Sequence, residues 1–264
     1  MTDRTYWQKQ TKEQPLFKDL LWSRPEQTAQ AGKLLIIGGN AHDFAAPAKA
    51  YTEAAKAGVG VSRVLLPDSL KKTVGRILEN GEYAPSTPSG SFARRALADL
   101  LELSGWADAT LLAGDFGRNS ETAILLEQFI SKYGGPIILT KDGVDYFVHA
   151  PATVLNRQAT ALVISFAQLQ KLAMNVRFDK AFTFDMDFLR LIDTLHDFSQ
   201  RYNAAIVVKH LESIFVAYAG QISSTKLNKD MPVWRVKTAA HAAVWQLQNP
   251  NKIFEALTSS LLFS

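Results

Sequence analysis

A strand, a turn, a helix and a second strand follow one another between residues 33 and 67, and they constrain the fold more than any other feature of the sequence. The run of leucine and isoleucine at residues 34–37 is short and entirely apolar, which is typical of a strand covered on both faces. An alanine-rich helix comes next, and residues 61–66 are a second apolar strand, closed by Pro67. This order predicts two parallel strands of an α/β sheet.

The turn after the first strand indicates a ligand contact. Gly38 and Gly39 allow a sharp turn and bring backbone N–H groups close to a ligand, because no Cβ intervenes. The helix after Asn40 would point its positive N-terminal end at that ligand, which favours anions such as phosphate. A second interpretation is equally open: two glycines often serve turn geometry alone, and a full GxGxxG or GxxxxGK[ST] motif is missing here.

The rest of the chain continues the alternation of strands and helices. Strands are predicted at 109–114, 137–139 and 205–209, with a short one at 154–155 and a hairpin over 213–222. Helices are predicted at 69–78, 92–103, 121–132, 159–172, 186–202, 236–248 and 253–262, and a loop at 81–91. Ser120, and either Asp68 or Ser69, are the expected N-caps. The predicted fold is a three-layer α/β sandwich, with a mostly parallel sheet between helices on both faces.

Composition limits the class of protein. The 264 residues are 47% hydrophobic and 20% charged, as expected of a globular protein. We expect one domain over residues 32–264, preceded by an N-terminal extension at residues 1–31. The net charge of +4 is scattered, so we expect no nucleic-acid partner. The absence of cysteine excludes disulfides and thiolate chemistry. No apolar stretch approaches the roughly 20 residues of a membrane span, so we expect a cytoplasmic protein with no membrane partner.

Apolar residues near both ends suggest docking surfaces. Those of the extension could pack on the body of the protein or on another subunit, and together with the C-terminal group they suggest a homo-oligomer. They are Trp7, Leu16, Phe17, Leu20, Leu21 and Trp22 in the extension, and Phe254, Leu257, Leu261, Leu262 and Phe263 near the C-terminus.

Four segments match the motifs of one family in order and spacing. Residues 35–40, Ala46-Pro47 and residues 54–60 are similar to its VIGGS…GAP…AAxRAGAG block. Residues 112–118 are similar to its IGPGLGR turn, 137–144 to VLDADAL and 207–209 to VVLKG. On these segments, over most of residues 33–220, the chain resembles the ADP- or ATP-dependent NAD(P)H-hydrate dehydratases of the ribokinase superfamily.

The resemblance implies a reaction and a site. A nucleotide, ADP or ATP with Mg²⁺, would phosphorylate the hydroxyl of hydrated NADH or NADPH, and loss of phosphate would restore the nicotinamide ring. A nucleotide or a dinucleotide of the NAD(P)H type would thus be the small-molecule partner. The residues that would contact it are Gly38, Gly39, Asn40, Ala46, Pro47, Gly114, Asp115, Phe116, Gly117, Asp142 and Lys209.

The sequence departs from the family where phosphoryl transfer takes place. Family members carry a GTGD segment at the start of the late helix, but residues 228–236 contain no glycine, and Val236 or a near neighbour stands at the aspartate position. Trp234 would crowd the phosphate, and the family's PHPGE segment is also missing after Leu155. The resemblance therefore implies a dehydratase-like nucleotide-binding protein that is either an ADP- or ATP-dependent NAD(P)H-hydrate dehydratase, a lyase, or a pseudoenzyme with degenerate catalysis, and we assign no catalytic residue. The alternatives are a non-catalytic ribokinase-fold scaffold and a divergent sugar or vitamin kinase.

Several polar residues keep two interpretations each. Asp115, where the family has proline, would hold Mg²⁺ or a ribose hydroxyl, or else stabilise its own turn as an Asx-type residue. Asp142 would face the ligand or cap the next turn. Lys209 would meet a phosphate or extend to solvent.

Other polar residues fit a structural or surface role better than a catalytic one. His42 and Asp43 are adjacent and suggest an acid/base pair, although neighbouring side chains usually point apart. Asp230 is the carboxylate nearest to the missing base, and a solvated loop charge is its simpler interpretation. The five histidines show no metal-binding spacing, so we expect no metal site.

Overall fold

The computed structural model describes residues 4–75, 81–226 and 234–263 of the chain. Ten strands lie within these residues. In chain order they are β1 (Trp7–Gln10), β2 (Lys33–Gly38), β3 (Val61–Pro67), β4 (Gly81–Ala84), β5 (Ala109–Gly114), β6 (Ile137–Thr140), β7 (Thr160–Ile164), β8 (Ala205–His210), β9 (Ser213–Tyr218) and β10 (Gln221–Lys226).

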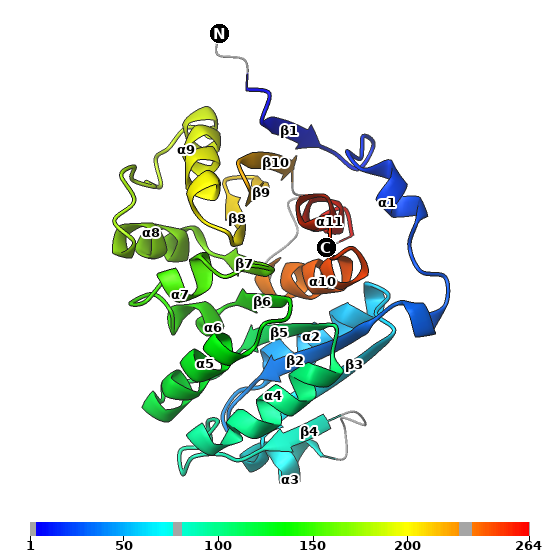
Figure 1. The fold of residues 1–264 in the computed structure, drawn as a ribbon, viewed down its shortest axis with the longest axis vertical. Coiled ribbons are helices and arrows are strands. Elements are labelled where there is room, and N and C mark those ends of the chain that lie inside the picture. The colour runs from blue at the N-terminus through cyan, green and yellow to red at the C-terminus, as the bar shows by residue number, and fades with distance from the viewer. Residues whose placement is uncertain (1–3, 76–80, 227–233, 264) are drawn as a thin grey trace.

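All ten strands join one sheet at the centre of the molecule (Figure 1). Their order is β1-β10-β9-β8-β7-β6-β5-β2-β3-β4. Every neighbouring pair is parallel except those formed by β9, which runs antiparallel to both β8 and β10. The carboxyl ends of β2, β5, β6, β7 and β8 therefore lie at one edge of the sheet, the edge at which α/β sheets bind ligands. The predicted mostly parallel sheet and the hairpin of β9 and β10 are confirmed.

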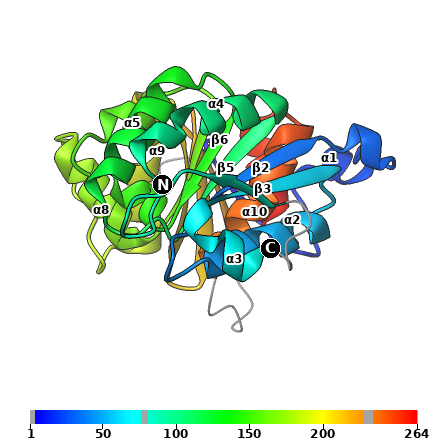
Figure 2. The same cartoon turned by 90° about the horizontal axis from the view of Figure 1, so that it is seen from below.

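Helices cover the sheet on both faces (Figure 2). Short 3₁₀ turns precede β2, α3 and α4, at Thr28–Gln30, Asp68–Leu70 and Arg94–Ala96. The α-helices of the described residues are α1 (Lys18–Trp22), α2 (Ala45–Lys56), α3 (Lys71–Val74), α4 (Leu97–Trp106), α5 (Ser120–Lys132), α6 (Asp142–Asp145), α7 (Ala152–Leu155), α8 (Phe166–Asn175), α9 (Phe188–Arg201), α10 (Trp234–Gln248) and α11 (Ile253–Ser260).

Alternate residues of each strand point to opposite layers of the sandwich. On β2, Leu35 and Ile37 belong to the core layer that also contains side chains of α4, α5, α8 and α9, whereas Leu34 and Ile36 belong to the layer that contains side chains of α2, α10 and α11. All four residues are fully buried. This explains the continuous apolar run, because neither face of a strand buried on both sides contacts water. The predicted three-layer sandwich is confirmed.

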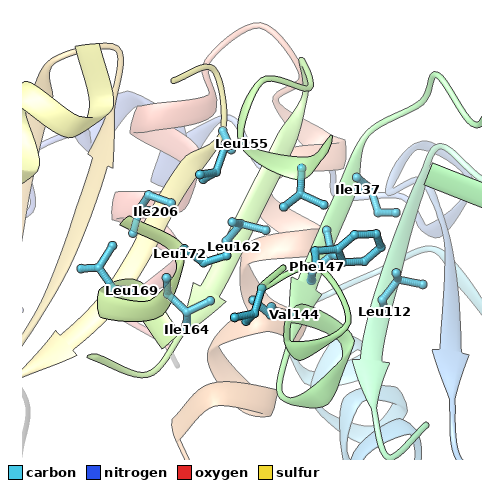
Figure 3. Close-up of a cluster of buried hydrophobic side chains, with 14 of the residues drawn as sticks. Leu112, Ile137, Val144, Phe147, Leu155, Leu162, Ile164, Leu169, Leu172 and Ile206 are labelled. Atoms are coloured by element: carbon cyan, nitrogen blue, oxygen red, sulfur yellow. The ribbon is translucent and has the colours of Figure 1, made fainter. Parts of the chain in front are cut away.

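The larger of the two core layers is continuous beneath α6, α7 and α8 (Figure 3). Side chains from β5, β6, β7 and β8 meet those of the three helices there. Leu112, Ile137, Leu162 and Ile206 come from the strands. The segment that follows β6 is thus fixed by apolar packing on its inner side, and this fixes the position of the polar residues at its start.

The N-terminal segment packs on the body of its own chain. Strand β1 pairs with β10 at one edge of the sheet, and the Arg4 guanidinium donates two hydrogen bonds to Asp193 of α9 at 2.6 and 2.9 Å. Leu20 is 3% exposed and packs with Trp245 and Ala256, whereas Trp22 is 87% exposed. The apolar residues of this segment are therefore divided between packing in cis and exposure to solvent.

Three sequence-based assignments of secondary structure are wrong. The helix expected over 159–172 is strand β7 followed by α8, because a short apolar run fits a buried strand as well as a helix, and Ser165 begins α8 with a capping box. Residues 154–155, expected as a strand, belong to α7. The loop expected over 81–91 contains β4, a four-residue strand at the edge of the sheet that pairs with β3.

The helix starts also differ from expectation. The N-cap of α5 is Asn119, whose side chain accepts from the N–H groups of Glu121 and Thr122, so Ser120 is the first helical residue. Neither Asp68 nor Ser69 caps a helix; the Asp68 carboxylate accepts from the Ser86 N–H at 3.0 Å instead. The helix expected over 92–103 begins as a 3₁₀ turn and becomes α4 only at residue 97. The predicted end of the helix after Asp68, up to residue 78, lies outside the described residues.

Within the part of the chain that the structure describes, no helix combines the length and the apolar character that a membrane crossing requires.

Candidate functional site

The two glycine turns that the sequence indicates lie side by side. They follow β2 and β5, which are neighbouring parallel strands. The N–H of Gly39 donates to the carbonyl of Gly114 at 3.0 Å, and the Asn40 side chain donates to the carbonyl of Asp115 at 2.6 Å. The polar groups of the two turns thus bond to each other across the edge of the sheet.

Glycine is required where the two turns touch. A Cβ atom at position 38 would lie 2.4 Å from the carbonyl oxygen of Gly114, well inside van der Waals contact. Gly39 and Gly114 also have φ values of 89° and 106°, a backbone region that residues with a side chain rarely adopt. The geometric interpretation of these glycines is therefore correct, whether or not a ligand binds beside them.

The start of α2 already holds an anion supplied by the protein. The Ala46 N–H donates to Oδ2 of Asp115 at 2.6 Å, and the Lys141 ammonium forms an ion pair with Oδ1 of the same carboxylate. The Asp115 side chain is only 3% exposed. Phe44 at the N-cap of α2 provides no side-chain hydrogen bond. The carboxylate of Asp115, which directly follows β5, instead neutralises the positive N-terminal end of this helix. These partners are distant in sequence, so Asp115 is not the Asx-type stabiliser of its own turn.

Asp142 holds the turn after β5 from the other side. Its carboxylate accepts from the N–H of Asp115 at 2.7 Å and from the N–H of Gly117 at 3.2 Å. Burial raises the pKa of Asp142, although these two hydrogen bonds and nearby Lys141 act in the opposite direction. The side chain therefore caps the β5 turn, and not the turn that follows its own position.

The remaining predicted contact residues lie apart from this group. Phe116 is fully buried and packs with Phe92 and Tyr146, so its side chain belongs to the core. Lys209 is half-buried at the end of β8, three strands from β5, which corresponds to roughly 14 Å at the usual strand spacing. Pro47 is buried in the first turn of α2. Ligand contacts at these residues stay predictions.

Sequence reasoning missed three polar residues that extend the network. Lys141 is one of them, and it follows β6 directly with a φ of 52°. The Gln168 amide donates to the Lys141 carbonyl at 2.7 Å and to Asp145 at 2.8 Å, while Arg235 at the start of α10 donates to Gln168 at 3.3 Å. A lysine directly after a buried strand on the ligand edge was the available signal for Lys141. Nothing in the sequence connects Gln168 and Arg235.

A hollow of about 370 Å³ lies beside the network, at the start of α5. Residues 117–120 and the side chains of Asp142, Asp145 and Tyr146 line it. The Tyr146 hydroxyl donates to the carbonyl of Gly117 at 2.6 Å and closes one wall. A larger hollow of about 720 Å³, with Arg94 and Arg95, lies between the segment 86–97 and α5, and its lining includes no residue of either turn.

The other candidates have structural partners or lie in solvent. His42 and Asp43 are both exposed, and Asp43 accepts from the Ala45 N–H at 3.0 Å. Asp230 lies outside the described residues. Among the residues that are described, no group of three or more histidine, aspartate or glutamate side chains is placed to hold a metal ion.

A nucleotide phosphate would have to compete with the protein's own carboxylates for the N–H groups of the two turns. Phosphate binding at such turns needs backbone N–H groups without another partner. The N–H groups of Ala46, Asp115 and Gly117 donate to the carboxylates of Asp115 and Asp142. The protein's own carboxylates thus take the place of a ligand anion.

Comparison with known proteins agrees with this fold. A ribokinase-like superfamily protein from Enterococcus faecalis superimposes with a TM-score of 0.75 and 13% identity, over 98% of this chain and 86% of the other. The ADP/ATP-dependent NAD(P)H-hydrate dehydratase from Bacillus subtilis, co-crystallised with ATP/Mg²⁺, does so with a TM-score of 0.61 and 11% identity, over 94% and 86% of the two chains. The protein has the ribokinase-like fold.

Sequence comparison is more specific. The chain is 25% identical over 189 residues to the bifunctional NAD(P)H-hydrate repair enzyme Nnr of Methanothermobacter thermautotrophicus, which is 70% of this chain and 35% of the relative. It is 28% identical over 116 residues to Nnr of Methanocaldococcus jannaschii, 44% of this chain and 23% of the relative. The matches thus span about a third and a quarter of those proteins. No protein-family model matches the chain. Over the matched residues the chain is thus similar in sequence to proteins named NAD(P)H-hydrate repair enzymes.

Proposed function

We propose that this protein binds an adenine nucleotide or a nicotinamide dinucleotide but does not convert hydrated NADH or NADPH. The observation that carries the proposal is the meeting of the β2 and β5 turns at the carboxyl edge of parallel strands, where α/β sheets bind ligands. The relatives named NAD(P)H-hydrate repair enzyme and the Bacillus subtilis dehydratase with ATP/Mg²⁺ support this class of ligand.

The sequence before α10 supports the loss of turnover. Phosphoryl transfer needs N–H donors for the moving phosphoryl group and a base for the attacking hydroxyl. Residues 228–236 contain no glycine and no carboxylate after Asp230, and residues 228–233 lie outside the described part of the chain. Loss of one such donor costs about 3–4 kcal/mol of transition-state stabilisation. Loss of the donors and the base together reduces turnover below detection.

Two measurements on the purified protein test the proposal. Calorimetry with ADP, ATP and NADPH reports binding, and incubation of hydrated NADH with ATP or ADP reports conversion. We expect binding of at least one of the three ligands without formation of NADH. Formation of NADH by the purified protein would overturn the loss of turnover, and the absence of any binding would overturn the binding function.

A non-catalytic scaffold is the second candidate. One observation favours it: the N–H donors of Gly39, Asp115 and Gly117 are all satisfied within the chain. A protein of this kind would show no heat of binding with any nucleotide. A ligand at 100 times its dissociation constant stabilises a protein by about 2.7 kcal/mol, so thermal unfolding separates the two candidates.

A further inference from the structure

One carboxylate occupies the position at which the two turns and α2 would otherwise hold an anion. Asp115 accepts from the Ala46 N–H at the start of α2 and pairs with the Lys141 ammonium, with its side chain 97% buried. A backbone N–H at a helix start and an ammonium are two of the donor types that bind phosphate groups in proteins. Both donate to one carboxylate of the same molecule.

The backbone of Asp115 is fixed without its side chain. Its carbonyl accepts from the Asn40 side chain at 2.6 Å, and its N–H donates to Asp142 at 2.7 Å. Its φ is 62°, in the left-handed region that glycine adopts without cost and asparagine tolerates. The carboxylate is therefore not needed to hold the turn, and position 115 accepts glycine or asparagine without a change of backbone.

Lys141 is committed to the same carboxylate. It also has a left-handed backbone, with a φ of 52°, and it follows β6 next to β5, so its side chain reaches across the strand ends to Asp115. Left-handed residues other than glycine occur mostly where the surrounding structure requires them. Without Asp115, the Lys141 ammonium and the Ala46 N–H would lose the carboxylate that bridges them, while Asp43 would still accept from the Ala45 N–H.

We infer that Asp115 is an internal competitor for ligand phosphate and determines the specificity of this site. A phosphate-bearing ligand reaches the Ala46 N–H only by displacing the Asp115 carboxylate, and the charge of Lys141 beside it is already paired with that carboxylate. The Asp115 carboxylate therefore weakens the binding of a ligand phosphate in the wild-type protein, and its removal strengthens that binding. This inference rests on the proposed function only where it concerns nucleotide binding. Binding of inorganic phosphate can be measured whether or not the protein binds a nucleotide.

The test is titration of the full-length protein with inorganic phosphate, ADP and adenosine, followed by calorimetry. We expect Asp115→Gly to bind phosphate and ADP at least about tenfold more tightly than wild type, because charge-assisted hydrogen bonds become available. Asp115→Asn keeps the size of the side chain and should show a smaller gain in the same direction. The affinity for adenosine, which carries no phosphate, should be the same in all three proteins.

Asp43 supplies the matched control. Its carboxylate also accepts from an N–H at the start of α2, that of Ala45 at 3.0 Å, but it is exposed and no ion pair with Lys141 is present. Asp43→Gly should therefore leave phosphate affinity unchanged. The inference is overturned if neither Asp115 variant gains phosphate affinity, or if Asp43→Gly gains as much as Asp115→Gly. A wild-type protein that binds no nucleotide, beside an Asp115→Gly variant that binds phosphate, would overturn the proposed function and support this inference.

Discussion

His241 of α10 lies with its Nε2 atom 3.4 Å from Oε2 of Glu53 on α2, in the interior between the two helices. Their side chains are 3% and 1% exposed. Burial alone would raise the pKa of Glu53, but hydrogen bonds from Lys56 and Lys49 outweigh it and lower that pKa to about 2. Burial lowers the pKa of His241 to about 4, against the opposing effect of Glu53. At neutral pH an ionised carboxylate therefore accepts a hydrogen bond from a neutral imidazole.

This pair predicts a loss of stability in mild acid. In the unfolded chain His241 takes up a proton near pH 6.5, whereas in the folded protein it does so only near 4, so the free energy of unfolding falls as the pH drops through this window. The full shift corresponds to about 3 kcal/mol. Glu53 adds a further loss between its usual pKa of 4.5 and about 2. Urea denaturation across this pH range measures both effects.

The His241→Gln variant isolates the histidine contribution. It should lose the pH dependence between 6.5 and 4, while the matched change of exposed His149 to glutamine should retain it. An unchanged pH profile in His241→Gln would show that other groups cause the acid instability.

Two glycine-to-alanine changes should shift the free energy of unfolding in opposite directions. In Gly38→Ala the new Cβ would lie 2.4 Å from the backbone oxygen of Gly114, so β2 and β5 must separate, at a cost of about 1–3 kcal/mol or more. Gly105 lies within α4 with nothing within 4 Å of an added Cβ, so Gly105→Ala should stabilise by about 0.5–1 kcal/mol. Denaturation midpoints of the two variants on either side of the wild-type value would confirm the prediction. Equal shifts would contradict the close contact at Gly38.

Phe116 should behave as a core residue. It is fully buried, so Phe116→Ala should lower the free energy of unfolding by about 3–5 kcal/mol through the cavity it leaves. Phe184 is 63% exposed, and Phe184→Ala should cost less than about 1 kcal/mol. Chemical denaturation of both variants makes the comparison. If Phe116→Ala kept the stability of the wild type, the Phe116 side chain would not be a core residue and would be available to contact a ligand.

The sequence predicted the central strands well for a physical reason. β2, β5 and β6 are mostly apolar runs that end at glycine or a turn, and β3 ends in an apolar run before Pro67. Such runs fit a sheet buried on both faces. β7 has the same apolar character, but it runs almost directly into α8, so the two merge into one apparent helix. β4 is an edge strand of the sequence GEYA, which has no apolar run to mark it.

The location of the candidate site was predictable, but its contents were not. Glycines after β2 and β5 mark the two turns, and parallel pairing brings them together. The partners of Asp115 are 69 and 26 residues away in sequence, and only the register of β5 and β6 and the position of α2 bring Ala46 and Lys141 to it. No local pattern encodes such a contact. This is why the sequence suggests a phosphate where the structure holds a carboxylate.

Gln10 should anchor the N-terminal segment to the sheet. Its fully buried amide donates to Thr258 O at 2.8 Å and to Thr225 Oγ1 at 3.2 Å, and its oxygen accepts from the Leu16 N–H at 3.4 Å. Gln10→Ala leaves these groups without a partner and should cost about 1–3 kcal/mol, with faster hydrogen exchange in β1 and β10. Gln8 lies on the same strand with an exposed side chain, so Gln8→Ala should change neither quantity. Equal effects of the two substitutions would show that β1 is held by backbone pairing alone.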